Sequence, residues 1–126
     1  MEKFILYAAV NGFLVVALGA FGAHGLEEKI SEASLNTWNT AVLYQMFHVA
    51  GLILTAFLCY IFPASKSFSR SAYAFQIGIV LFSGSLYLLA LTSITFFAYI
   101  TPVGGLCFLA GWGWIVHGLL RSRSKS

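Results

Sequence analysis

Charged residues are scarce in this sequence, at 9% of 126 residues, whereas proteins on average carry about 25%. Hydrophobic residues make up 60%, and the few charges are gathered between long uncharged stretches. A water-soluble domain needs more polar surface than this composition can supply. The sequence therefore predicts an integral membrane protein, with a length that suits one domain.

Cysteine is almost absent, and no basic stripe runs along any helix face. Cys59 and Cys107 lie in apolar runs without the paired spacing of a disulfide framework or a zinc site. The seven Lys and Arg residues lie at the ends of segments, which is not the pattern of a nucleic-acid-binding surface. We expect no metal, no cofactor and no nucleic-acid partner.

Four uncharged runs are long enough to cross a bilayer, which requires about 20 apolar residues. They predict an all-α, polytopic membrane protein, a compact bundle of helices over residues 4–23, 41–62, 72–91 and 102–120. A cleaved signal peptide is the competing interpretation of the first run, but the run exceeds the usual apolar core of about 7–15 residues.

Polar segments mark the expected helix ends. Ser31 is a candidate N-cap for a short amphipathic segment before the second helix, in which Trp38 suits an anchor at the membrane interface. Residues 92–101 are expected to form an uncharged, aromatic loop. Thr101 and Pro102 then have the pattern of an N-cap and first residue of the fourth helix.

The distribution of Lys and Arg predicts the topology. With four spans, Lys3, Lys66, Arg70, Arg121, Arg123 and Lys125 fall on one side, and only Lys29 falls on the other. Because cytoplasmic loops are enriched in Lys and Arg, we expect a multi-pass membrane protein with both termini in the cytoplasm.

Small residues recur at seven-residue spacing in three of the predicted helices. These are Gly12 and Gly19 in the first, Gly78, Ser85 and Thr92 in the third, and Gly104, Gly111 and Gly118 in the fourth; Gly22 adds to the small face of the first. Such lines allow close approach of helix backbones, on which association within lipid depends. The alternative is that glycine is simply frequent in membrane helices.

No Asp, Glu, Lys or Arg lies within the predicted spans, which argues against a proton-coupled pump with an intramembrane carboxylate. We expect His24 and His48 to face one polar pocket near the outer surface, with Asn11, Tyr44 and Gln45 beside them. His117 lies too far along its helix to join. The pocket is either a hydrogen-bonded structural cluster or a site for a ligand or ion, since an unpaired polar group in hydrocarbon is costly.

Several short motifs follow one another along nearly the whole chain. They are Asn11-Gly12, residues 17–26, Trp38-Asn39-Thr40-Ala41, Tyr44-Gln45-Met46-Phe47-His48, residues 82–87 and Thr101-Pro102-Val103-Gly104-Gly105. Together they resemble the YgdD/YwdK family of small bacterial inner-membrane proteins of unknown function. The resemblance implies a four-helix membrane protein and supplies no reaction, substrate or catalytic residue.

The sequence favours a non-enzymatic protein that acts by binding, as an accessory subunit, an assembly factor or a lipid- or ligand-binding protein. Its partners would be the lipid bilayer and either another membrane protein or further copies of itself. The alternative is a small transporter or channel that acts as an oligomer. A membrane enzyme is the least favoured reading, because no general base with a partner is evident in the sequence.

Overall fold

The computed structural model describes residues 1–124, and nearly all of them are helical. The elements are α1 (Glu2–His24), α2 (Glu32–Ile61), α3 (Ser67–Gly78), the π-helical turn η1 (Ile79–Ser83), α4 (Gly84–Thr92) and α5 (Phe96–Ser124). Because α3, η1 and α4 follow one another without a break, they form one rod. Lys125, which counts toward the predicted topology, lies outside the described residues.

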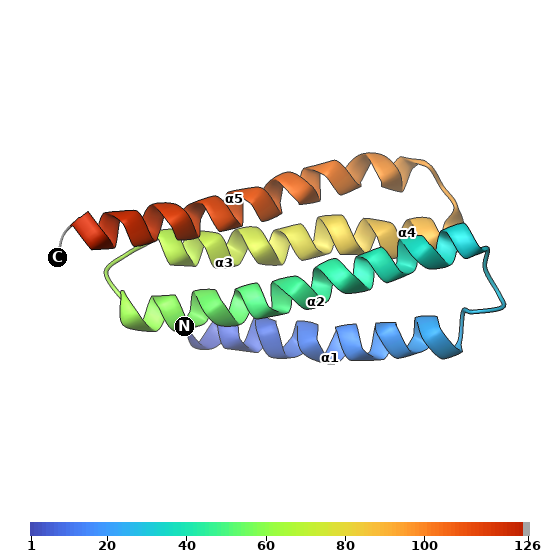
Figure 1. Cartoon of the computed structure of the whole chain (residues 1–126), viewed down its shortest axis with the longest axis horizontal. Coiled ribbons are helices and arrows are strands. Elements are labelled where there is room, and N and C mark those ends of the chain that lie inside the picture. The colour runs from blue at the N-terminus through green and yellow to red at the C-terminus, as the bar shows by residue number, and fades with distance from the viewer. Residues whose placement is uncertain (125–126) are drawn as a thin grey trace.

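Four helices are long and apolar enough to span a membrane, with 23, 30, 26 and 29 residues. They lie side by side and alternate in direction, so that the N-terminus and the end of α5 are at the same end of the molecule (Figure 1). α1 packs on α2, α2 packs on the α3–η1–α4 rod, and the rod packs on α5. This arrangement confirms the prediction of an all-α membrane protein with four packed helices.

The segment before the second predicted span is part of α2. Ser31 caps the helix, as expected, because its hydroxyl accepts a hydrogen bond from the Ser34 backbone N–H at 3.1 Å. The interpretation of Trp38 as an interfacial anchor is wrong. Its side chain is only 2% exposed, and its indole N–H donates to the Leu18 carbonyl of α1 at 2.9 Å. The indole fits there because Gly22 has no side chain, and a Cβ at Gly22 would come within 2.5 Å of Trp38 Nε1.

The fourth span begins earlier than predicted. α5 starts at Phe96, so Pro102 lies inside the helix and the reading of Thr101 and Pro102 as N-cap and first residue is wrong. Only residues 93–95 separate α4 from α5, and the aromatic segment expected to be a loop is mostly helical. Pro102 is the seventh residue of α5, beyond the four N–H groups that have no partner at a helix start, so it costs the helix one backbone hydrogen bond.

The rod and α5 are joined by phenylalanines packed over glycines. Along the rod, at seven-residue spacing, Phe68 lies against Gly118, Phe75 against Gly111 and Phe82 against Gly104. A Cβ at any of these glycines would overlap its neighbour. At one position the roles of the two helices are exchanged. Phe108 of α5 lies over Gly78 of the rod, where a Cβ would be 2.5 Å from the ring. The close approach of these two helices therefore depends on glycine.

The other small residues of the predicted lines differ in how tightly they are packed. Gly12 and Gly19 face Val49 and Val42 of α2, but a Cβ at either would make only an ordinary contact, at 3.9 and 3.5 Å. Ser85 is buried, and its hydroxyl lies 2.6 Å from that of Thr101. Thr92 is exposed at the end of α4 and does not extend the line.

Candidate functional site

A chain of hydrogen bonds between side chains crosses the middle of the bundle. Asn11 of α1 donates to Gln76 Oε1 of α3 at 2.8 Å, and Gln45 of α2 donates to Asn11 Oδ1 at 3.2 Å. The Tyr87 hydroxyl of α4 then donates to Gln45 Oε1 at 2.7 Å. We call these four residues the amide network. It joins the first three spans through side chains alone.

The donors and acceptors of the amide network complement each other. The second hydrogen of the Asn11 amide goes to the Tyr7 carbonyl at 2.8 Å, one turn earlier in α1. Asn11 and Gln45 are 4% and 3% exposed, so lipid and water hardly reach either side chain. Among residues 1–124, every buried side-chain nitrogen or oxygen has a partner. In hydrocarbon such pairing is required, because an unsatisfied polar group costs several kcal/mol.

His48 belongs to a second polar group, which faces α5. Its Nδ1 lies 2.8 Å from the Tyr44 carbonyl, and its Nε2 accepts from the indole N–H of Trp112 at 3.1 Å. A tryptophan N–H can only donate, so Nε2 must be the unprotonated nitrogen and Nδ1 must carry the hydrogen. The ring also stacks on Phe108, with centroids 3.6 Å apart. The imidazole is thus held neutral in one tautomer.

The predicted pocket shared by His24 and His48 does not form. His24 is exposed at the end of α1, and the contacts of His48 come from α2, α3 and α5. The reason is rotation about the helix axis. Gly22 faces Trp38, and His24 is two residues further, about 200° around the helix at roughly 100° per residue.

The remaining members of the predicted pocket are divided between two places. Asn11 and Gln45 meet in the amide network, whereas Tyr44 lies beside His48. The Tyr44 side chain is 40% exposed and its ring packs on Phe82, with centroids 4.5 Å apart. Tyr44, His48 and Trp112 line a groove of about 470 Å³ between α2 and α5, with mostly aromatic and aliphatic walls.

Sequence reasoning missed Tyr87 and Trp112 as partners and left Gln76 outside the pocket. A signal for Gln76 was present. Asn11 and Gln76 each lie nine residues after the first residue of their helices (11 − 2 and 76 − 67), and both helices begin at the same end of the bundle (Figure 1). Equal depth in two apolar helices favours a hydrogen bond between the amides. Trp112 carries no comparable signal.

Within residues 1–124, no three His, Cys, Asp or Glu side chains come together as a metal site would require. The polar side chains at the centre of the bundle, Asn11, Gln45 and His48, are in hydrogen bonds within the fold, and these bonds connect helices. The fold and its polar interior thus define a polytopic membrane bundle held together by buried amides and packed glycines.

Comparison with known proteins identifies the family. A family model described as "Protein of unknown function (DUF423)" matches residues 18–105, and the chain belongs to this family. It is similar to the UPF0382 membrane protein YwdK of Bacillus subtilis, with 47% identity over 92% of this chain and 94% of the relative. The UPF0382 inner membrane protein YgdD of Escherichia coli is 40% identical over 96% of this chain and 92% of the relative.

A third relative, the UPF0382 membrane protein SSP2132 of Staphylococcus saprophyticus, is 42% identical over 96% of this chain and 99% of its own length. No solved structure matches the chain. With its four candidate spans, the chain is a multi-pass inner-membrane protein.

Proposed function

We propose that this protein acts by binding, as a non-enzymatic accessory, assembly or lipid-binding protein of the inner membrane. One observation carries the proposal. The buried polar side chains hydrogen-bond to one another across helices, in the amide network and between His48 and Trp112. Such groups stabilise one arrangement of the helices, and a rigid bundle is suited to presenting fixed surfaces to lipids or to another protein.

The outer face of the bundle supports the same proposal. Large apolar side chains on all four spans are widely exposed, among them Phe13 at 77%, Leu109 at 69%, Val80 at 59% and Phe57 at 57%. In a bilayer these side chains contact lipid tails, a neighbouring membrane protein or a second copy of the chain. Association there is driven by van der Waals packing, to which a rigid apolar surface is well matched.

We propose further that both termini face the cytoplasm. The basic residues divide unequally between the two ends of the bundle (Figure 1). The end at which the chain begins and α5 finishes has Lys3, Lys66, Arg70, Arg121 and Arg123, and the opposite end has Lys29. The positive-inside rule assigns the basic end to the cytoplasm. The connection between α1 and α2, with Glu27, Glu28 and Lys29, would then face outward.

Purification of the full chain in native lipid discs tests the functional proposal. Co-purifying lipids and proteins are quantified against the surrounding membrane, for the natural chain and for Tyr87→Phe, which removes the donor to Gln45 but leaves the outer face intact. We expect at least one molecule at fixed stoichiometry with both chains, and a lower unfolding temperature for the variant alone. Absence of any enriched molecule would contradict the proposal, as would solute or ion flux through the purified chain in vesicles.

A further inference from the structure

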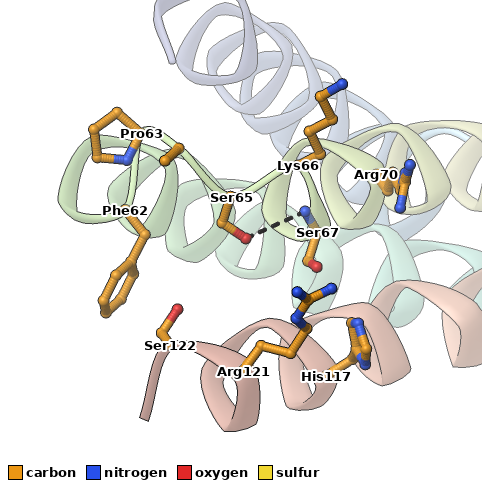
Figure 2. A pocket seen from close by; sticks show the side chains of 10 residues that line it. Phe62, Pro63, Ser65, Lys66, Ser67, Arg70, His117, Arg121 and Ser122 are labelled. Atoms are coloured by element: carbon orange, nitrogen blue, oxygen red, sulfur yellow. Dashed lines mark hydrogen bonds between the residues drawn. The ribbon is translucent and has the colours of Figure 1, made fainter. Parts of the chain in front are cut away.

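A basic cavity lies at the end of the bundle that holds both termini. Its volume is about 540 Å³, and it is formed by the connection between α2 and α3, the first turn of α3 and the last turns of α5 (Figure 2). Lys66, Arg70 and Arg121 contribute three positive charges to its lining, and His117 lies beside them. Among residues 1–124, no carboxylate side chain lines this cavity.

The first turn of α3 adds a weakly paired backbone donor beside the same space. Lys66 occupies the N-cap position and makes no capping hydrogen bond through its side chain. The Ser67 backbone N–H has only a long contact, 3.4 Å, to the Ser65 hydroxyl (Figure 2). The first N–H groups of a helix lack partners within it, and their partial positive charge attracts anions.

The Ser67 side chain is a second and independent indication of a ligand. The residue is only 7% exposed and its side chain lines the cavity, on the side that faces Arg121 (Figure 2). Within the described part of the chain its hydroxyl has no hydrogen-bond partner, although its backbone N–H has one. Because every buried side-chain oxygen of residues 1–124 has a partner, this unpaired hydroxyl is the accessible part of Ser67. It opens on a basic space, where it is suited to donate to an anionic oxygen.

The positions of the arginines follow from packing on α5. A Cβ at Gly118 would lie 2.9 Å from Ser67 Cβ, so this glycine brings α5 close to the start of α3. Arg121 is three residues further along α5 and therefore on the same face. The Arg70 guanidinium lies over the Trp114 ring at 4.9 Å, and Trp114 meets His117 edge-on with centroids 5.5 Å apart. Stacking restrains Arg70 before any ligand arrives.

We propose that this cavity binds a phosphate group, as the head group of an anionic phospholipid or as free phosphate. Arginine recognises phosphate through parallel N–H donors, and basic pockets between helix ends are suited to anionic head groups. Lys66 points away from Arg121 in Figure 2 and adds its charge at longer range. The proposal rests on the proposed binding function and names the chemical class that this site recognises.

The test uses the full chain in discs of phosphatidylcholine, with or without phosphatidylglycerol. Native mass spectrometry measures retained phosphatidylglycerol, and a separate titration adds inorganic phosphate to discs of phosphatidylcholine alone. Arg121→Gln removes a charge from the cavity. Arg123→Gln removes the same charge two residues away on α5, at a position that does not line the cavity. Ser67→Ala removes only the hydroxyl that opens on the cavity.

We expect binding to fall about fivefold in Arg121→Gln and about threefold in Ser67→Ala, and less than twofold in Arg123→Gln. Retention of phosphatidylglycerol identifies a lipid head group, whereas saturable binding of inorganic phosphate without lipid selectivity identifies free phosphate. The proposal fails if neither probe binds, or if Arg123→Gln loses as much as Arg121→Gln while Ser67→Ala loses nothing. If the proposal fails in this way but a different molecule is retained in native lipid discs, the proposed binding function still holds and only this phosphate site is excluded.

Discussion

At the scale of single residues, His48 shows how hydrogen bonds inside the bundle determine which ring nitrogen of a histidine carries the proton. Both ring nitrogens are used, one by the Tyr44 carbonyl and one by the Trp112 indole. Because the indole cannot accept a hydrogen bond, a second proton on His48 would remove this contact between α2 and α5. The histidine therefore connects helices in its neutral form, and neither nitrogen is free for a metal ion or a proton relay.

Trp112→Phe tests this role. The variant keeps an aromatic ring but leaves His48 Nε2 without its donor, and we expect the free energy of unfolding in detergent to fall by about 1–3 kcal/mol. Trp114→Phe is the matched control on the same helix, because Trp114 lies against Arg70 and His117 rather than His48. Equal losses in the two variants would mean that the indole N–H contributes nothing beyond the size of the ring.

At the scale of elements, the contact between the α3–η1–α4 rod and α5 determines the shape of the bundle. Phenylalanines of the rod pack over the glycines of α5, and the Ser71 hydroxyl donates to the Gly111 carbonyl at 2.7 Å. A side-chain donor reaches a backbone carbonyl of the neighbouring helix only when the two helices are very close. Glycine permits this approach, and the serine uses it for a hydrogen bond.

Gly111→Ala and Gly113→Ala separate this packing from helix propensity. A Cβ at Gly111 would overlap the Phe75 ring, whereas a Cβ at Gly113 meets nothing within 4 Å. We expect Gly111→Ala to reduce the free energy of unfolding by about 1–3 kcal/mol through overpacking, and Gly113→Ala to reduce it not at all. Thermal unfolding in detergent measures both. A Gly113→Ala variant as unstable as Gly111→Ala would remove the argument from close packing.

The sequence predicted the elements better than their ends. Seven-residue spacing pointed to Gly104, Gly111 and Gly118, and each lies against the rod. The start of α5 was misplaced because residues 96–101 are uncharged and aromatic, a composition that both a loop in the interface and a helix can have. The turn η1 has no signal of its own, since one extra residue in a helical turn leaves an apolar run equally apolar.

At the scale of the whole molecule, the number of spans could be predicted because uncharged runs of about 20 residues have few alternatives in a membrane protein. The meeting of polar groups could be predicted only in part. Depth along the helices predicted that His24 and His48 would meet, but rotation about each helix axis decides which polar groups do. That rotation removed His24 from the predicted pocket and placed Gln45 and His48, three residues apart, in different polar groups.

The central claim at this scale is a four-span bundle whose basic end lies in the cytoplasm. Reporter fusions after Ser126 and within residues 27–31, in the connection between α1 and α2, measure it directly. One reporter is an enzyme active only inside the cell, and the other is active only outside. We predict inside activity for the C-terminal fusion and outside activity for the fusion in the connection. A C-terminal fusion active only outside, or two fusions on the same side, would contradict the account.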